Sequence, residues 1–435
     1  MADSNPGKIN VLLIGSGGRE HALAWALRKS DRTGQLFIAP GNPGTARCGT
    51  NVPLDTSNQE AVLAFIEDHQ IGLTVVGPEQ PLVEGIADFL SANGKLVFGP
   101  SQAAARLEGS KSFAKDIMKK YGVPTGDYLV FEGHEADAAR AHITQNNSWP
   151  MVLKADGLAA GKGVFIPQNL EEALWSLDAL VTDDLYGKSG TRLVIEEYLT
   201  GEEVSVFAIC DGKNARILMH AQDHKRIGDG DTGLNTGGMG AYAPTRLLDD
   251  AGLAAVQEKI VEPMLHGMAA EGAPYVGVLY CGLMITPDGP KVIEFNCRFG
   301  DPECQVIMPA LQSDFTDLLL AACEGRLDTY VPDIDMQQWY TCLVLASGGY
   351  PGSYEKGKVI TGIPTESEQV QVFHAGTKTD AEGRLVTNGG RVLNVVAKGE
   401  TLQDSIRLAY DAASLISFEG LYKRTDIGAK GLAKF

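Results

Sequence analysis

The strongest constraint on the fold is an alternation of strand-like and helix-like stretches in the first hundred residues. Apolar runs typical of strands lie at 9–14, 36–39, 73–76 and 96–98, with helix-like stretches at 21–28 and 59–69. Strands that alternate with helices are joined by crossover connections, which favour parallel pairing. The start of the chain therefore predicts a Rossmann-like parallel sheet.

The rest of the chain predicts further domains. At 435 residues it is too long for one ordinary hydrophobic core. We predict an N-terminal domain at 1–106, a central domain at 107–335 and a small β-rich C-terminal domain at 336–435. Within the central domain, residues 125–195 return to strand and helix alternation around a glycine-rich turn. The predicted class is a multidomain mixture of α/β and α+β.

Composition excludes several classes of function. With 44% hydrophobic and 21% charged residues the chain is globular, and its formal charge of −18 argues against general binding to nucleic acids or anionic membranes. No apolar run approaches the roughly 20 residues of a membrane-spanning helix. The start has no cleavable signal pattern, and the seven cysteines include no CxxC pair. We expect a cytoplasmic protein without structural zinc, either a monomer or a weak dimer.

The densest chemical signal is a strand-like run that carries Glu294, Asn296 and Arg298. Because side chains on a strand alternate between faces, these three should project together, while Ile293 and Phe295 pack behind them. A carboxylate and an amide oxygen suit Mg²⁺, which shares its ligands with nucleotide phosphates. The arginine can hold a carboxylate or phosphate in a forked pair of hydrogen bonds. A buried ion pair at a strand end is the alternative reading.

A first glycine-rich element, Gly15 to Glu20, follows a strand and opens a helix. Its backbone N–H groups and the helix dipole form an anion site, to which Arg19 adds charge. The element departs from the dinucleotide fingerprint because Glu20 occupies the last glycine position. A nicotinamide-dependent oxidoreductase would also need an acidic residue at the end of the second strand, and 36–40 ends without one. A simple phosphate site is therefore the favoured reading.

Two further loops carry cationic residues. A strand delivers Lys154 to a loop in which Lys162 lies between two glycines, a pattern that lets backbone amides and ammonium groups surround phosphates. A glycine-rich stretch at 228–240 follows Asp223 and Lys225, which could hold a phosphorylated sugar and an amine together. Long ordered loops in compact domains are usually functional. A surface hairpin and a solvated charge run are the respective alternatives.

In chain order, the strand lysine, the glycine–lysine loop, the paired glutamates at 196–197 and the final Glu-x-Asn-x-Arg resemble an ATP-grasp ligase. The whole chain, from about 8 to 428, resembles more closely the phosphoribosylamine–glycine ligase family, also called glycinamide ribonucleotide synthetase. The segments that carry this resemblance are 11–27, 39–45, 75–86, 108–118, 154–164, 222–242 and 294–303.

The resemblance implies an ATP-grasp domain at 107–335, in which the lobe 125–195 closes over ATP. The family joins glycine to 5-phosphoribosylamine through a glycyl phosphate, giving glycinamide ribonucleotide, ADP and phosphate in de novo purine biosynthesis. Mg²⁺ or Mn²⁺ would accompany ATP. Another ATP-grasp carboxylate–amine ligase, acting on a different acid, is the alternative.

The resemblance also assigns roles to residues. The metal ligands would be Glu294 and Asn296, and the catalytic residues Arg298, Asp223 and Lys225. The expected ATP contacts are Lys111, Lys154, Gly161, Lys162, Gly163, Glu196, Glu197, Leu199 and Glu203. The expected substrate contacts are Gly18, Arg19, Asn42, Gly44, Glu79, Asp223, Lys225 and Arg298. The strand at 279–284 lacks the acid that many ATP-grasp proteins use as a second metal ligand, so Glu294 would be the sole carboxylate on the metal.

Overall fold

The N-terminal part of the protein contains the parallel sheet that the sequence predicts. The computed structural model describes residues 7–146, 148–158, 163–181 and 192–434. The first sheet has the strand order β3-β2-β1-β4-β5, and its neighbouring strands pair in parallel. Its strands are β1 (Ile9–Gly15), β2 (Thr33–Pro40), β3 (Thr50–Asn51), β4 (Ile71–Val76) and β5 (Val97–Phe98). The accompanying helices are α1 (Gly18–Lys29), α2 (Gln59–Asp68), α3 (Glu79–Val83) and α4 (Ile86–Ala92). Because helices cover both faces, β1 is apolar and buried over its last five residues.

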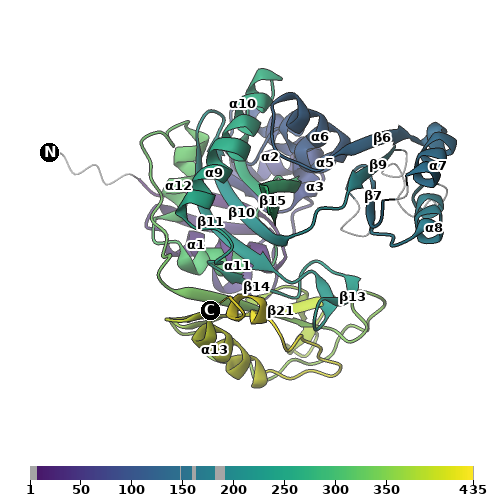
Figure 1. Ribbon diagram of the computed structural model, residues 1–435. Coiled ribbons are helices and arrows are strands. Elements are labelled where there is room, and N and C mark those ends of the chain that lie inside the picture. The colour runs from purple at the N-terminus through teal and green to yellow at the C-terminus, as the bar shows by residue number, and fades with distance from the viewer. Residues whose placement is uncertain (1–6, 147, 159–162, 182–191, 435) are drawn as a thin grey trace.

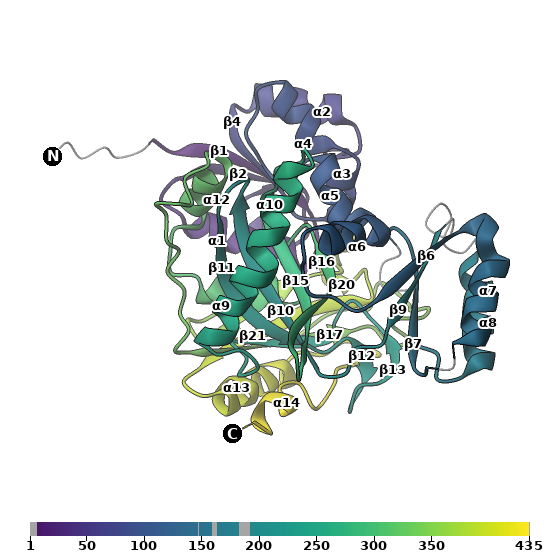
Figure 2. The same cartoon turned by 45° about the horizontal axis from the view of Figure 1, so that its top comes forward.

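Two helices lead from this sheet into a small projecting lobe. They are α5 (Gln102–Gly109) and α6 (Lys111–Lys120). The hydroxyl of Ser110 accepts the Phe113 N–H and caps α6, so that Lys111 lies at the first position of the helix. The lobe consists of β6 (Tyr128–Glu132), α7 (Ala136–Gln145), β7 (Met151–Ala155), β8 (Val164–Phe165), α8 (Leu170–Val181) and β9 (Arg192–Glu197). It has its own sheet, β6-β9-β7-β8, and its own apolar core, and it projects away from the body in both views (Figures 1 and 2).

The central and C-terminal parts share one eight-stranded sheet of order β16-β15-β10-β11-β14-β17-β21-β18. Its strands are β10 (Glu202–Asp211), β11 (Ala215–Asp223), β14 (Gly240–Ala243), β15 (Val276–Thr286), β16 (Gly289–Asn296), β17 (Trp339–Ala346), β18 (Val370–His374) and β21 (Arg391–Gly399). The join is the antiparallel pairing of β14 with β17. The mixed fold class is confirmed, while the predicted boundaries at 106 and 335 stay predictions.

The remaining elements cover this sheet. The helices are α9 (Asp250–Val256), α10 (Glu262–Ala270), α11 (Cys304–Ala310), α12 (Phe315–Cys323), α13 (Leu402–Ser414) and α14 (Ala429–Leu432). Two short hairpins are β12 (Arg226–Gly228) with β13 (Thr232–Asn235), and β19 (Thr377–Thr379) with β20 (Leu385–Thr387). Figure 1 shows α13 beside the C-terminal strands and the β12–β13 hairpin on the same side of the body as the lobe. Across the described ranges, no helix has both the length and the apolar character to span a bilayer.

A buried histidine in β11 makes stability depend on pH. His220 is 3% exposed, its Nδ1 accepts the Thr245 N–H at 3.2 Å, and burial lowers its pKa to about 4. An unfolded histidine has a pKa of about 6.5, so between these two values the unfolded chain binds the additional proton. This residue therefore contributes stability at neutral pH that is lost as the pH falls through that window.

We expect His220→Asn to flatten this loss, because the amide oxygen can replace Nδ1 as the acceptor without titrating. The flattening should amount to about 3 kcal/mol between pH 7 and pH 4. Urea unfolding midpoints measured at several pH values in both proteins test it. Parallel pH profiles for the two proteins would contradict the prediction.

Candidate active site

The strand β16 presents its polar residues on one face, as predicted. Glu294, Asn296 and Arg298 are partly exposed, whereas Phe295 and Cys297 are buried in the core. Ile293 is only half-buried. The cause is a bulge: Leu283 pairs with position 292 and Gly282 with position 294, which leaves Ile293 without a partner in the register. The prediction that Ile293 packs behind this face therefore holds less well than that for Phe295.

Two carboxylates hold the guanidinium of Arg298. Its Nη2 donates to Glu108 Oε1 at 2.7 Å and its Nε to Glu79 Oε2 at 3.2 Å. Burial lowers the pKa of Arg298, but the Glu108 and Glu79 carboxylates raise it by more. The guanidinium therefore stays charged. The other oxygen of Glu108 accepts the Cys297 N–H at 2.8 Å. The ion pair considered as the alternative is thus present, at the same place as the candidate site.

Glu108 is a residue that the sequence interpretation missed. It stands first in the motif at 108–118, but nothing in that motif indicates which cation it meets. Lys115 and Glu303, both buried, were also not among the predicted site residues.

Glu294 lies at the centre of a group of cations. Burial raises the pKa of its carboxyl, but Lys225, Lys154, Lys111 and Arg298 lower it more, so the net direction is downward. The structure thus brings together residues from the lobe, from α6, from the loop after β11 and from the end of β16. Positive charge concentrated around one carboxylate is suited to a polyphosphate with a bound cation.

The donors present fit a divalent cation that takes most of its ligands from elsewhere. Glu294 and Asn296 supply one carboxylate and one amide oxygen on the same face of β16. The cross-strand partner of Glu294 is Gly282, which has no side chain to offer. Over the described residues there is no group of three or more His, Cys, Asp or Glu side chains able to hold a metal. An ion at this place would depend on phosphate and water oxygens.

Lys154 of the lobe and Lys115 of α6 form a buried pair of lysines beside Glu196. Lys154 Nζ lies 3.0 Å and Lys115 Nζ 2.9 Å from Glu196 Oε2. Burial raises the pKa of Glu196, but the two ammonium groups lower it more. The second oxygen, Glu196 Oε1, is buried without a hydrogen-bond partner in the structure as described. This acceptor is available to an N–H donor on a bound molecule. Lys111 donates to the Gly157 carbonyl at 2.8 Å.

The other expected ATP contacts divide into two groups. Gly161 and Lys162 lie outside the described residues. The Gly163 carbonyl accepts the Ala155 N–H at 2.9 Å, Glu197 is exposed at the end of β9, and Leu199 is half-buried two residues later. Their contacts with ATP stay predictions.

The loop after β11 carries a close ion pair. Lys225 Nζ lies 2.6 Å from Glu203 Oε2, so one of the carboxylates expected to contact ATP is paired with a lysine. Burial, with the nearby Glu303 and Glu203 carboxylates, raises the pKa of the Asp223 carboxyl to about 7, although Lys225 acts to lower it. Asp223, Lys225 and Glu294 therefore interact electrostatically as one group.

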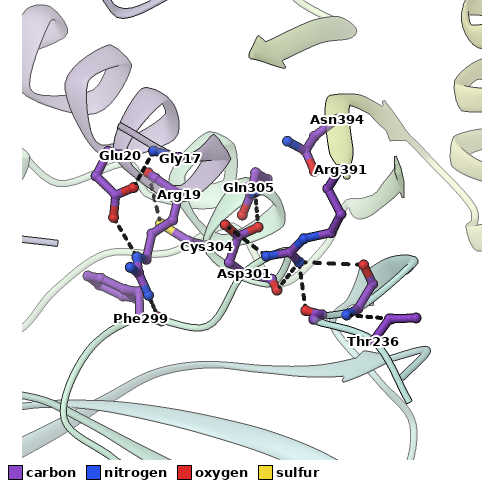
Figure 3. Close-up of polar contacts among 12 residues, drawn as sticks. Gly17, Arg19, Glu20, Thr236, Phe299, Asp301, Cys304, Gln305, Arg391 and Asn394 are labelled. Carbon is purple, nitrogen blue, oxygen red and sulfur yellow. Dashed lines mark hydrogen bonds and ion pairs between the residues drawn. The ribbon is translucent and has the colours of Figure 1, made fainter. Parts of the chain in front are cut away.

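The first glycine-rich element is occupied by the protein's own side chains. Arg19 is buried, and its Nε lies 2.6 Å from Glu20 Oε1. Glu20 Oε2 accepts the Gly17 N–H at 2.6 Å, so this glutamate closes the start of α1. Figure 3 shows Asp301 between Gln305, whose Nε2 donates to Asp301 Oδ1 at 2.7 Å, and Arg391, whose Nη2 lies 3.4 Å from Asp301 Oδ2. The predicted contact of Gly18 and Arg19 with a sugar phosphate stays untested.

Asn42 and Gly44 lie against the C-terminal domain. Asn42 Nδ2 donates to the carbonyls of Ser16 and His374 at 2.8 and 2.9 Å, and Asn42 Oδ1 accepts the Gly44 N–H at 2.8 Å. These contacts tie the N-terminal loops to the C-terminal strands. The predicted substrate contacts of both residues stay untested.

Comparison with known proteins decides the family. The sequence matches the N domain of phosphoribosylglycinamide synthetase at residues 9–108, the ATP-grasp (A) domain at 109–304 and the C domain at 340–430. The chain belongs to the phosphoribosylglycinamide synthetase family. Curated relatives named phosphoribosylamine–glycine ligase include those of Yersinia pestis, 47% identical over 98% of this chain and 100% of the relative, and of Rhizobium meliloti, 49% identical over 98% and 99%.

A solved structure of a family member has the same fold. The phosphoribosylamine–glycine ligase of Thermotoga maritima superposes with a TM-score of 0.84 at 38% identity, over 96% of this chain and 100% of that one. The resemblance seen in the sequence motifs is thereby confirmed, and this synthetase-family chain carries the ATP-grasp domain that its lysines and β16 predict.

Proposed function

We propose that the protein ligates glycine to 5-phosphoribosylamine at the expense of ATP, forming glycinamide ribonucleotide, ADP and phosphate. The observation that carries the proposal, beside family membership, is the Glu294 carboxylate with Lys111, Lys154, Lys225 and Arg298 around it. This group offers clustered positive charge for phosphates next to a carboxylate and an amide that fit a divalent cation. A ligase for a different acid has no comparable support among the relatives.

The chemistry explains why such a site is needed. A carboxylate is a poor acylating agent because oxide is a poor leaving group. An oxygen of the glycine carboxylate attacks the γ-phosphorus of ATP, ADP leaves, and glycyl phosphate forms. The sugar amine then attacks the carbonyl carbon, the C–N bond forms, and phosphate leaves with the electrons of the C–O bond. Both steps develop negative charge on phosphate oxygens, which fixed cations stabilise.

Different residues of this chain bind the different substrates. Lys111 and Lys154 hold the ATP phosphates, and Lys225 and Arg298 orient the two smaller substrates. The unpartnered Glu196 Oε1 accepts from the amino group of adenine. Glu294 and Asn296 would hold Mg²⁺ or Mn²⁺, which would neutralise charge on the phosphates. The lobe at 125–195 closes over ATP, which excludes water from the acyl phosphate.

Asp223 is suited to the final proton transfer. Its pKa of about 7 lies near the operating pH, where a carboxylate can take the proton that the attacking amine releases. The amine is already a good nucleophile toward an acyl phosphate, so this group assists the reaction without being indispensable to it.

We keep the cytoplasmic location and the monomer or weak dimer as predictions. The seven cysteines are all free, and each is buried or partly buried, which suits a reducing compartment.

The direct test is ADP release with ATP, Mg²⁺, glycine and freshly made phosphoribosylamine, with each component omitted in turn. We expect release only in the complete mixture, with glycinamide ribonucleotide as the product identified by mass spectrometry. Release that needs neither glycine nor the sugar amine, or that follows only with another acid, would contradict the substrate assignment.

A further inference from the structure

The loop that carries Lys225 is fixed by the C-terminal domain. We call residues 224–239 the substrate loop; it contains the β12–β13 hairpin and connects β11 to β14. The carbonyl of Lys225 accepts both the N–H and the hydroxyl of Thr236 at 2.8 Å, so the loop's two ends are tied together. A long glycine-rich loop has little apolar surface of its own to bury, and its order has to come from outside contacts.

Arg424 supplies the most enclosed of these contacts. Its side chain is 0% exposed. Nη1 donates to the Arg226 carbonyl at 3.0 Å and to Asp231 Oδ1 at 2.9 Å, both in the substrate loop. Nε and Nη2 donate in a fork to the two oxygens of Asp426 at 2.7 Å each. One planar guanidinium thus joins the residue after Lys225 to the C-terminal segment.

Neighbours of Arg424 bind the same hairpin. Asp426 Oδ2 also accepts the Gly230 N–H at 2.8 Å. The hydroxyl of Tyr422 donates to the Ile227 carbonyl at 2.8 Å. Burial raises the pKa of Asp426, but hydrogen bonds from Arg424 and Gly230 lower it more, and the carboxylate stays ionised. The loop backbone is therefore held at successive points by one short segment of chain.

A second arginine holds the far end of the loop. Arg391 Nη1 donates to the carbonyls of Gly237 and Asp301 at 2.6 Å each, and the Gly237 N–H donates to the Tyr350 hydroxyl at 3.0 Å. Figure 3 shows this arginine between the loop and the segment after β16. The C-terminal domain thus forms hydrogen bonds with the substrate loop near both of its ends.

Stability alone gives a weak reason for a wholly buried arginine. Burying charged groups costs desolvation free energy, and the attraction between the paired charges only about offsets that cost. Proteins with apolar residues in place of such a pair are often as stable. A rigid guanidinium fork does fix the positions of the groups that it binds. The carbonyls bound by Arg424 and Arg391 belong to the loop that carries Lys225, which points to a role in geometry.

We infer that Arg424 is a positioning residue, which holds the substrate loop so that Lys225 stays beside Glu203 and Glu294. The site's Lys225 and Asp223 come from the central domain, but their placement then depends on the C-terminal segment 422–426. The effect on substrates rests on the proposed function, whereas the ordering of the loop does not.

The test compares Arg424→Lys and Arg424→Met with the unaltered protein. Lysine keeps the charge but lacks the fork. We expect both variants to raise the KM for phosphoribosylamine or lower kcat by about 10-fold or more, because small misplacements of a catalytic group are costly. The KM for ATP should change by less than about twofold, since Lys111 and Lys154 lie on other elements. Hydrogen–deuterium exchange should rise at 226–238 and stay unchanged in α12.

A milder variant tests the loop contacts without removing the arginine, and a control variant tests whether lower stability alone changes the kinetics. Tyr422→Phe removes one hydrogen bond to the same loop and should raise exchange at 226–228 without unfolding the domain. Val372→Ala removes part of a buried side chain from the C-terminal core, on β18, which forms the outer edge of the shared sheet and pairs with β21. It should lower the Tm without the change in KM for phosphoribosylamine.

Each result has a defined meaning. An unaltered KM and unaltered loop exchange in Arg424→Lys would overturn the inference, as would a Val372→Ala protein with the same kinetic change. If the unaltered protein makes no glycinamide ribonucleotide, the proposed function fails, and loop exchange alone still decides whether Arg424 anchors the loop.

Discussion

Glu294→Gln is expected to abolish ligation while leaving the protein folded. The change removes one negative charge and keeps the shape of the side chain. It leaves the cations that surround Glu294 without their common carboxylate and removes the only charged donor proposed for the metal. Metal assistance is worth several kcal/mol, so kcat should fall on the order of 10³-fold.

Binding experiments separate this cause from general damage. ATP binding to the unaltered protein should tighten with Mg²⁺, whereas binding to Glu294→Gln should lose most of that dependence. The pocket of the variant is more positive, so its affinity for metal-free ATP should be unchanged or higher. Glu419→Gln, on an exposed side chain that pairs with Lys358, is the matched control. A kcat within about tenfold of the unaltered protein would remove Glu294 from the proposed role.

Arg298→Met is expected to cost both stability and activity. The arginine is 19% exposed and the Glu108 side chain that it pairs with is 6% exposed. Removing one partner of a buried pair leaves the other charge uncompensated, at a cost of about 3–5 kcal/mol. Loss of a preorganised cation at the reacting phosphate and carboxylate should lower kcat by about 10²–10³-fold. Urea unfolding and steady-state kinetics measure the two effects.

A second substitution distinguishes the two roles of Arg298. In Arg298→Met combined with Glu108→Gln, no buried carboxylate is left unpaired, so we expect most of the lost stability to return. Activity should stay low, because the cation is still missing. Recovery of activity along with stability would mean that Arg298 only supports the structure.

Local patterns predicted much of the fold and of the site. The parallel N-terminal sheet was predictable because its strands, buried on both faces, read as continuous apolar runs. The common face of Glu294, Asn296 and Arg298 was predictable because side chains on a strand alternate. Each of these signals is contained in a short stretch of consecutive residues.

What the sequence did not reveal depends on contacts between distant segments. The bulge at Ile293 is set by the register against β15, and the partner of Arg298 comes from α5. The pairing of β14 with β17 also joins strands that are far apart in the chain. No local pattern encodes such registers, because any two apolar strands of suitable length could pair.

The shared eight-stranded sheet also bears on how the protein is made. When the ribosome has made about three quarters of the chain, β14 has been synthesised but its partner β17 has not, so one edge of the sheet is open. Open edges invite pairing with other chains, which makes an unfinished protein prone to aggregate. The nascent chain can complete its central sheet only after the C-terminal domain has been synthesised. Chaperone binding therefore matters most before β17 has been made.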